Sequence, residues 1–327
     1  MSETADRLVG LTAVTEGIET VAIGGHVHPD GDCAGAVTGL YHYLKKLRPQ
    51  LHVDVYLKKI SDAFAFLGDG IEIRDEADED DPQVYDLFVS LDCADKGRLG
   101  FSQPVFDAAK KTVSIDHHVS NPMYADINRV AGSASSTCEL LWEEMDPELV
   151  DQTIATALFI GIAHDTGIFR YSCTSPKTLE IAAKLLETGI DASSLITETY
   201  CEKTIEQQRA TADAVLRAEL YVDGKMIAST MSVSQREAHN AKSEHMDGIV
   251  EQLRDTRGIE CSAFLHEYKK GVWKMSLRSA GKVDVQAIAA HFGGGGHVRA
   301  AGATIETEDP QSVIDQVAVC VREQLEA

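Results

Sequence analysis

Three short apolar runs in the first half of the chain each end at residues that can bind a metal ion. Residues 20–23 precede His26-Val27-His28-Pro29-Asp30-Gly31-Asp32, residues 87–91 precede Asp92, and residues 112–115 precede Asp116-His117-His118. Each run has the length and composition of a buried β-strand. In an open α/β sheet the loops after the carboxyl ends of the strands converge on one crevice. The side chains that follow these runs are therefore expected to reach a common point.

The stretches between the runs have the pattern of helices, which predicts an α/β protein. Helices are expected at residues 34–47, 135–145 and 151–164, and a further strand at 53–57. Strands that alternate with helices form a parallel sheet with helices on both faces. Asp165 directly follows the last of these helices and is a further acidic candidate.

The pattern changes after Gly189 and predicts a second, smaller α/β domain. Residues 191–213 are polar and helix-prone, and we interpret them as a linker. Strand-like alternation follows at 218–222, 226–233, 259–268 and 272–277, with helices at 284–291 and 310–325. The length of the chain also favours two domains. The predicted organisation is a first domain at 1–190, the linker at 191–213 and a second domain at 214–327.

The charge of the chain limits its partners. Its 327 residues include 52 acidic against 30 basic ones, a net charge of −22. Long nucleic acid needs many Lys and Arg contacts to phosphates, so long duplexes are excluded and a phosphate-bearing ligand must be small or held locally. The seven cysteines form no CxxC pair, which indicates a reducing compartment. Residues 1–16 show neither a leader peptide nor a membrane span, so a cytoplasmic protein without a membrane partner is expected.

The residue types after the three runs favour a site for two metal ions. Asp30 and Asp32 lie two positions apart around Gly31, a spacing that aims both carboxylates at neighbouring ions. A mixture of carboxylates and imidazoles suits Mn²⁺ or a similar first-row ion better than Ca²⁺. Two such ions about 3.5–4 Å apart suit phosphoester hydrolysis. Taken singly, Asp-Gly-Asp is often only a turn, Asp92 could cap a helix and His117-His118 could lie on a surface. The prediction of a metal site depends on all of these residues occurring together.

These segments resemble the motifs of the DHH phosphoesterase superfamily over nearly the whole chain. Residues 26–32 resemble its first motif, Asp92 its second, Asp116-His117-His118 its signature triplet and residues 163–167 its fourth motif. The resemblance implies that the first domain binds two divalent metal ions, with Mn²⁺ expected. The implied metal ligands are His26, Asp30, Asp32, Asp92, His117 and Asp165, of which Asp92 bridges the two ions. The implied catalytic residues are Asp92, His118 facing the substrate phosphate, and Asp116 supporting the histidines.

Three residues in these motifs have open roles. His28 stands where many members of the superfamily have Asn, and it is either a further ligand or no ligand at all. Cys33 and Cys93 each place a thiol beside a predicted ligand. They are either small buried side chains or sites of oxidation.

The second domain carries a run of glycines that can receive a phosphate. Gly293-Gly294-Gly295-Gly296-His297 follows a predicted helix, and consecutive glycines let backbone N–H groups approach a phosphate closely. The run resembles the GGGH motif of the DHH-associated C-terminal domain, which together with a strand-end arginine binds substrate across the interdomain cleft. The residues implied to bind substrate are Arg278, Ser279, Gly294, Gly295, Gly296 and His297. Arg98 is added because it follows the second motif closely, although it could be a plain surface cation. Residues 133–137 begin a helix that either binds phosphate or has an ordinary N-cap.

The resemblance implies a phosphoesterase that hydrolyses short oligoribonucleotides (nano-RNA and dinucleotides) and 3′-phosphoadenosine 5′-phosphate. Cyclic dinucleotides, or pyrophosphate as in the family II pyrophosphatases, are the alternative substrates. A nucleotide sensor without catalysis would have lost a ligand, and none of the predicted ligands is missing. The expected partner is a short RNA or nucleotide, and a homodimer is left open.

Overall fold

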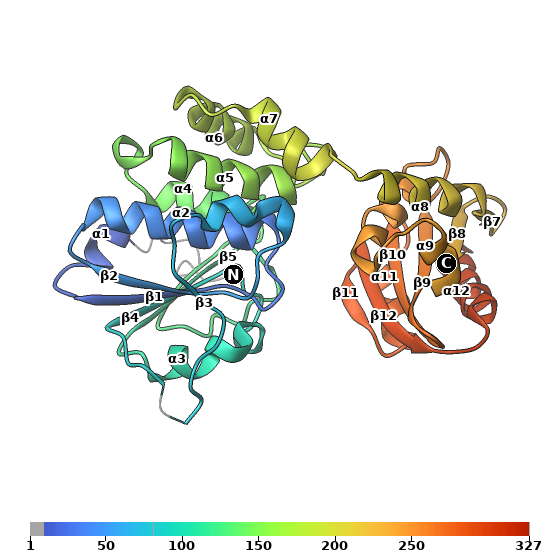
Figure 1. Cartoon of the computed structure of the whole chain (residues 1–327), viewed down its shortest axis with the longest axis horizontal. Helices are drawn as coiled ribbons and strands as arrows, with labels where there is room; N and C mark the ends of the chain where they lie inside the picture. The colour runs from blue at the N-terminus through green and yellow to red at the C-terminus, as the bar shows by residue number, and fades with distance from the viewer. Residues whose placement is uncertain (1–9, 81, 327) are drawn as a thin grey trace. The chain divides into compact units, whose positions relative to one another are not determined.

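In the computed structural model the described residues, 10–80 and 82–326, belong to two compact units, Met1–Glu202 and Lys203–Ala327 (Figure 1). The boundary between the units lies inside the segment 191–213 that we predicted as a linker. That segment is helical over most of its length, because it contains α7 (Ala192–Ile196), a π-helical turn η4 (Thr197–Cys201) and most of α8 (Ile205–Leu216).

Unit 1 contains a six-stranded sheet in the order β3-β2-β1-β4-β5-β6, and every neighbouring pair is parallel. Its strands are β1 (Thr20–Gly24), β2 (His52–Tyr56), β3 (Ile73–Arg74), β4 (Leu87–Leu91), β5 (Thr112–Asp116) and β6 (Ile127–Val130). The chain order reverses between β1 and β4, and such a switch point is where open α/β sheets bind ligands. The predicted parallel sheet is confirmed.

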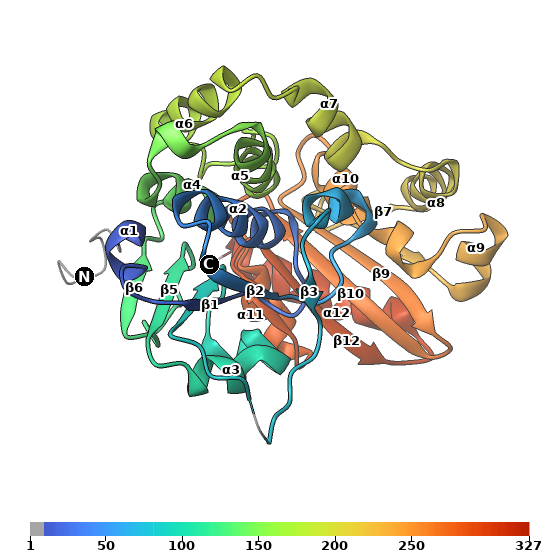
Figure 2. The same cartoon turned by 60° about the vertical axis from the view of Figure 1, so that its left-hand side comes forward.

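Helices cover both faces of this sheet, as predicted. One face carries α1 (Leu11–Val14), α2 (Gly31–Leu47), α4 (Thr137–Glu144) and α5 (Gln152–Asp165), and α6 (Pro176–Glu187) and α7 lie outside α5 (Figure 2). The opposite face carries α3 (Gln103–Ala108). The connections contain the 3₁₀-helices η1 (Asp62–Gly68), η2 (Lys96–Ser102) and η3 (Pro147–Leu149). The sequence reasoning missed α6.

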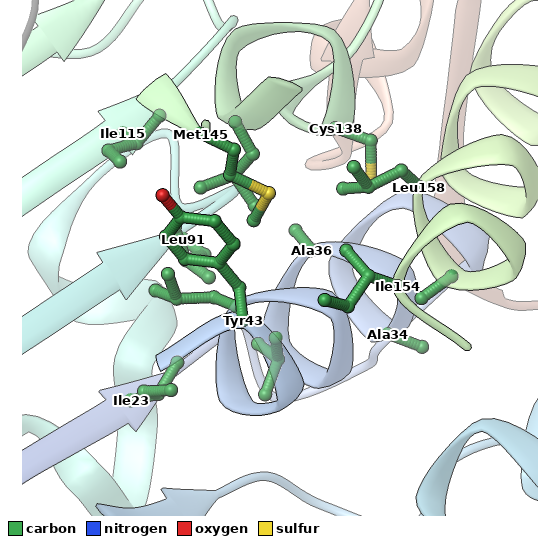
Figure 3. Packing of buried hydrophobic residues seen from close by; sticks show 14 of the residues in the cluster. Ile23, Ala34, Ala36, Tyr43, Leu91, Ile115, Cys138, Met145, Ile154 and Leu158 are labelled. Atoms are coloured by element: carbon green, nitrogen blue, oxygen red, sulfur yellow. The ribbon is translucent and has the colours of Figure 1, made fainter. Parts of the chain in front are cut away.

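The core of unit 1 lies between the sheet and the layer of α2, α4 and α5. Side chains of β1, β4 and β5 face those of the helices, and Tyr43 of α2 lies among them (Figure 3). Tyr43 is fully buried, and its hydroxyl oxygen accepts a 2.9 Å hydrogen bond from the backbone N–H of Asp146. The polar atom of this large side chain is therefore satisfied inside the core.

Glycines let α2 and α5 approach each other closely. Gly31, Gly35 and Gly39 follow each other at intervals of four residues, which places them on one face of α2. A Cβ atom added at Gly35 would lie 2.3 Å from the carbonyl oxygen of Ala157 on α5, and one at Gly31 would lie 2.7 Å from the side chain of His164. The glycines thus bring the start of α2 and the end of α5 together, and both ends carry predicted ligands.

Unit 2 contains a mostly antiparallel six-stranded sheet in the order β11-β12-β10-β9-β8-β7, in which only β8 and β9 pair in parallel. Its strands are β7 (Glu219–Tyr221), β8 (Met226–Met231), β9 (Cys261–Lys269), β10 (Val272–Ser279), β11 (Gly295–His297) and β12 (Ala300–Glu306). Its helices, besides α8, are α9 (Val233–Ala238), η5 (Ser243–Met246), α10 (Ile249–Arg254), α11 (Val285–His291) and α12 (Pro310–Glu326). One face of the sheet packs on α11 and α12, and the other packs on α8 and α10. The smaller α/β domain is confirmed, although β11 and β12 were not predicted.

None of the helices within the described residues has both the length and the apolar character needed to cross a membrane.

Candidate metal centre and substrate-binding residues

The predicted ligands of unit 1 converge at the carboxyl ends of β1, β4 and β5. His26 Nε2 lies 3.5 Å from Asp92 Oδ2, and His117 Nε2 lies 3.6 Å from Asp92 Oδ1. Asp165, at the end of α5, places Oδ2 3.1 Å from His117 Nε2. Asp92 therefore lies between two histidines from different segments of the chain, the arrangement expected of a bridging ligand.

Asp30 caps the helix that carries Asp32. Its Oδ1 accepts hydrogen bonds of 3.1 Å from the N–H groups of both Asp32 and Cys33, so it serves as the N-cap of α2. The same Oδ1 lies 3.8 Å from Nε2 of His26. The turn between β1 and α2 thus orients His26 and Asp30 toward each other.

Asp32 is anchored by the N-terminus of another helix. Its two carboxylate oxygens accept hydrogen bonds from the N–H groups of Thr137 (2.6 Å) and Cys138 (3.0 Å) in the first turn of α4. A carboxylate is favourable there because the free N–H groups and the dipole of a helix are positive at its start. The Thr137 hydroxyl also donates to Asp92 Oδ1 at 3.1 Å. The start of α4 therefore holds two predicted ligands in place.

This arrangement decides between the two interpretations of residues 133–137. Ser136 is an ordinary N-cap, since its hydroxyl accepts a 3.0 Å hydrogen bond from the N–H of Glu139. The N–H groups of Thr137 and Cys138 already bind Asp32 and are not directed at a substrate. The N-cap interpretation is confirmed.

Asp92 and Asp165 both occupy positions that a structural role alone would not favour. Asp92 has a left-handed backbone (φ 55°) while being 1% exposed, and such conformations are found mostly where function requires them. Asp165 is the last residue of α5, where the negative end of the helix dipole disfavours a carboxylate. Burial raises the pKa of Asp165, but the neighbouring imidazoles of His117 and His164 outweigh burial and keep that pKa below its ordinary value.

In the Asp-His-His triplet the aspartate positions the second histidine. Asp116 Oδ1 accepts hydrogen bonds from the ring Nδ1 (2.7 Å) and the backbone N–H (3.2 Å) of His118. Its Oδ2 accepts a 2.7 Å hydrogen bond from the side chain of Asn121, whose amide also donates to the carbonyl of Cys93. Although burial opposes the charge of Asp116, these hydrogen bonds lower the pKa of the carboxyl group. Sequence reasoning did not identify Asn121, for which no motif gave a signal.

The donor set fits divalent metal ions. The carboxylate, imidazole and thiol atoms form four groups whose members lie within 4.8 Å of one another: His26 with Cys33 and Asp92; Asp92 with His117 and His118; Asp30 with His164 and Asp165; Asp32 with His117 and Asp165. All six predicted ligands occur in these groups, and Asp92, His117 and Asp165 each occur in two. The buried Nδ1 atoms of His26 and His164 have no hydrogen-bond partner among the described residues. His164 is a candidate ligand that the sequence reasoning missed, and its position next to Asp165 was the signal that could have found it.

The carboxylates and imidazoles of this cluster shift one another's pKa values. Burial lowers the pKa of His26, but the carboxylates of Asp30 and Asp92 outweigh burial and raise it to about 9. The carboxylates of Asp165, Asp32 and Asp92 likewise raise the pKa of His117 above its ordinary value despite burial. Burial and the neighbouring carboxylates of Asp165 and Asp92 raise the pKa of Asp32. Buried carboxylates this close together either take up protons or are paired with cations, and divalent metal ions would supply that charge.

The structure places the three residues whose roles were open. His28 is exposed and belongs to none of the four groups found among the described residues. Cys33 and Cys93 are fully buried, and burial is the main cause that raises the pKa of both thiols. Since the thiolate is the reactive form, these cysteines have the character of buried core side chains.

The backbone of Arg98 is hydrogen-bonded to the first motif. It lies in η2, and its carbonyl accepts a 3.0 Å hydrogen bond from the N–H of Val27, next to His26. Its side chain is partly exposed. The residue thus ties the loop after β4 to the loop after β1.

In unit 2 the predicted arginine is held by a glutamate of α10. Arg278 Nε donates to Glu251 Oε1 at 2.7 Å, and one terminal nitrogen donates to the carbonyl of Leu277 at 2.9 Å. The Arg278 side chain is 27% exposed. Ser279 is 4% exposed, and its hydroxyl accepts a hydrogen bond from Gly281 N–H, which is the geometry of a local turn.

The second half of the glycine run belongs to the edge strand β11, which pairs with β12, and Gly293 and Gly294 precede that strand. A Cβ atom at Gly294 would lie 2.1 Å from the carbonyl oxygen of Gly302, and one at Gly296 would lie 2.5 Å from that of Ala300. Gly295 has open space where a Cβ would stand, and His297 is exposed. Two of the predicted substrate-binding glycines are therefore already required by the packing of the strand.

Comparisons with known proteins agree with this architecture. A family model described as the N-terminal domain of the DHH family matches residues 20–162, and one for the DHHA1 domain matches residues 223–323. A bifunctional oligoribonuclease and PAP phosphatase of Thermus thermophilus is 31% identical, over 93% of this chain and 90% of that protein. One of Bacillus subtilis is 26% identical, over 89% of this chain and 91% of that protein.

A solved structure has the same fold. It is an exopolyphosphatase-related protein of Bacteroides fragilis, 24% identical in sequence, which matches with a TM-score of 0.87 over 97% of this chain and 96% of that chain. Two family models cover most of the described chain, and a relative shares 31% of its residues over nearly the full length. The chain therefore belongs to the DHH family, with a DHHA1 domain after its N-terminal domain.

Proposed function

We propose that this protein is a metal-dependent phosphoesterase that hydrolyses short oligoribonucleotides and 3′-phosphoadenosine 5′-phosphate. The observation that carries the proposal is the convergence of carboxylate and imidazole donors at the switch point of a parallel sheet. The relatives from Thermus thermophilus and Bacillus subtilis, both called bifunctional oligoribonucleases and PAP phosphatases, support the choice of substrates.

The residues assigned to hold two divalent ions, with Mn²⁺ expected, are His26, Asp30, Asp32, Asp92, His117 and Asp165. When bound, such ions supply an activated water and neutralise charge on the phosphoryl oxygens. Asp92 is assigned to both ions because its two carboxylate oxygens lie beside different histidines, Oδ2 beside His26 and Oδ1 beside His117. His164 is added as a candidate ligand, since its ring belongs to a group with Asp30 and Asp165 and its buried Nδ1 has no hydrogen-bond partner among the described residues.

His118 is assigned to the substrate phosphate. Its Nδ1 donates to the charged Asp116 at 2.7 Å, so the ring orientation is fixed and Nε2 is the nitrogen assigned to a phosphoryl oxygen. Asn121 holds the other oxygen of Asp116, which prevents the carboxylate from rotating away. Asp116 and Asn121 therefore act by positioning.

Unit 2 is assigned to substrate binding, through Arg278, Ser279 and the residues of the glycine run. Arg278→Ala should raise the KM for dinucleotides roughly tenfold or more, the effect of losing a charge-assisted hydrogen bond. Hydrolysis of a small artificial phosphoester that has no second nucleotide should change little. An equal loss with both substrates would contradict the assignment.

The activity is tested with purified protein, Mn²⁺ and four substrates: a linear dinucleotide, 3′-phosphoadenosine 5′-phosphate, a cyclic dinucleotide and pyrophosphate. The proposal expects turnover of the first two, its loss with a chelator, and almost none in Asp92→Ala, since that change removes a ligand from two donor groups. Turnover of pyrophosphate alone would overturn it, and turnover of only the cyclic dinucleotide would move the protein to the alternative phosphodiesterase.

Chain length gives a second test. Longer strands would have to lie along a protein of net charge −22 without the Lys and Arg contacts that favour such binding. We expect kcat/KM to be highest for substrates of about two to five nucleotides and to fall toward about twenty. A flat or rising profile at fixed salt would indicate a processive exonuclease instead.

A further inference from the structure

The first turn of α4 contacts two of the assigned ligands through two different groups of one residue. The backbone N–H of Thr137 donates to Asp32 Oδ2 at 2.6 Å, and its hydroxyl donates to Asp92 Oδ1 at 3.1 Å. None of the three residues is more than 1% exposed. Asp32 lies on α2 and Asp92 follows β4, so Thr137 connects two segments that each carry a ligand.

The hydroxyl of Thr137 fixes the orientation of the Asp92 carboxylate. Each carboxylate oxygen has about two lone pairs that can accept a hydrogen bond or bind a metal. Oδ1 of Asp92 accepts from Thr137, and ring nitrogens of His117 and His118 each lie 3.6 Å from the same oxygen. With Oδ1 held in this way, Oδ2 is turned toward His26, whose Nε2 lies 3.5 Å away.

Thr137 is the donor that remains when the histidines bind metal. Among the described residues, the donors beside the Asp92 carboxylate are this hydroxyl and three histidine rings. A ring nitrogen that binds a metal must have lost its proton, so it can no longer donate to a carboxylate. The hydroxyl keeps its proton in both states and continues to orient Asp92.

A buried glutamate holds the turn that carries Thr137. Glu139 is 2% exposed, and its Oε2 accepts hydrogen bonds of 2.6 Å from the hydroxyl of Ser135 and 2.6 Å from that of Thr178. The backbone N–H of Ser135 donates to the same oxygen at 3.4 Å. Since Thr178 lies in the first turn of α6, Glu139 ties the start of α4 to the start of α6.

Helix α5 packs closely against the same turn. A Cβ atom added at Gly161 of α5 would lie 2.7 Å from Asp32 Oδ1 and 2.2 Å from the Sγ atom of Cys138. The start of α4 is therefore packed against α5 and hydrogen-bonded to α6, and it cannot shift without moving Asp32.

We propose that Thr137 is a positioning residue of the metal centre, whose hydroxyl orients Asp92 and whose N–H holds Asp32, while Glu139 fixes the turn that carries it. The inference rests on the proposed function, because it takes Asp32 and Asp92 as metal ligands. It predicts that the loss of a single hydroxyl weakens metal binding although every ligand is still present.

The first test is a calorimetric titration of the metal-free full chain with Mn²⁺. Thr137→Val keeps the backbone N–H but lacks the hydroxyl, and its Mn²⁺ affinity should fall roughly tenfold or more, the usual cost of losing a group that orients a ligand. Thr137→Ser keeps the hydroxyl and should bind as the wild type does. Thr38→Val is the matched control: Thr38 is fully buried on α2, and its hydroxyl donates to the carbonyl of Ala34 at 2.8 Å and to no ligand. Its Mn²⁺ affinity should be unchanged.

Melting temperatures with and without Mn²⁺ separate positioning from a structural role. A positioning residue predicts that metal-free Thr137→Val melts near Thr38→Val and gains less from Mn²⁺, since stabilisation by a ligand follows its affinity. Thr137→Ala, which places no methyl group beside the carboxylate, should show the same loss of affinity and replaces the valine variant if that one does not fold.

Three results would overturn the proposal: wild-type affinity in the variants without the hydroxyl, an equal loss in Thr137→Ser, or a lower metal-free melting temperature with an undiminished gain from Mn²⁺. Absence of Mn²⁺ binding by the wild type would refute the proposed function as well, so the two failures are distinguishable.

The second test concerns Glu139 and uses the Mn²⁺ dependence of dinucleotide hydrolysis. All three hydrogen bonds end on one oxygen, so the amide oxygen of Glu139→Gln can accept them and the half-maximal Mn²⁺ concentration should stay near that of the wild type. Glu139→Leu cannot accept them, and its half-maximal Mn²⁺ concentration should rise roughly tenfold. An unchanged Mn²⁺ dependence in Glu139→Leu would overturn the role given to Glu139.

Discussion

Replacing Gly35 by alanine should separate the two helices that carry half of the metal centre. The new Cβ would lie 2.3 Å from the carbonyl oxygen of Ala157, where ordinary contact begins near 3.4 Å, so α2 and α5 must move apart by about 1 Å. Because the obstacle is a backbone atom within a helix, no side-chain rotation relieves it. The displacement moves Asp32, on the first turn of α2, relative to Asp165 at the end of α5.

The expected magnitude follows from two opposing effects. Alanine is favoured over glycine inside a helix by about 1 kcal/mol, while overpacking a core costs about 1–3 kcal/mol. Gly35→Ala should therefore lower the free energy of unfolding by up to about 2 kcal/mol. Ligand distances in a metal site tolerate only about 0.2 Å of error, so Mn²⁺ affinity should fall at least tenfold, as for other changes that disturb ligand support.

Gly39→Ala is the matched control. It lies one turn further along the same face of α2, and its Cβ would meet the Leu158 side chain at 3.3 Å and that of Ala157 at 3.5 Å. We expect its stability to be equal to or slightly above that of the wild type, with Mn²⁺ affinity unchanged. Denaturant unfolding and calorimetric Mn²⁺ titration of both variants check this. If Gly35→Ala matches Gly39→Ala in both measurements, the close approach of the helices does not define the site.

Three further predictions concern the ligands, their protons and the glycine run. His117→Ala should lose bound metal, whereas His118→Ala should retain more of it and lose most of the rate; equal metal loss in the two variants would mean that their roles are misassigned. Since the pKa of His26 is raised to about 9 by Asp30 and Asp92 against burial, its ring is protonated below that pH and must lose the proton to bind a metal. Mn²⁺ affinity should therefore rise with pH between about 6 and 9 and binding should release protons, which calorimetry in buffers of different ionisation enthalpy measures; a pH-independent affinity would contradict this. Gly294→Ala, whose Cβ would lie 2.1 Å from a carbonyl oxygen, should lower the melting temperature, while Gly295→Ala, with open space, should keep it and raise only KM. An unchanged KM in Gly295→Ala would argue against contact of this glycine with substrate.

The sequence by itself was sufficient to predict the α/β class, the parallel sheet and the segments that carry the candidate metal centre. Each of these depends on local pattern: an apolar run of strand length, followed at once by residues with metal-binding side chains. Because loops after parallel strands meet at one edge, the position of Asp92 or Asp116 in the chain also predicted its position in the fold. The alternation of apolar and polar residues likewise predicted β8, β9 and β10 of the second unit.

Only the tertiary structure decided what each of these side chains contacts. Asp32 binds the N–H groups of residues more than 100 positions away, and Arg278 pairs with Glu251 on a helix that local pattern did not predict. The glycines of α2 and of β11 have their reason in the close approach of another backbone, which no periodicity within their own segment reveals. Pairing and burial depend on residues brought together from distant parts of the chain, and a local sequence pattern carries no information about them.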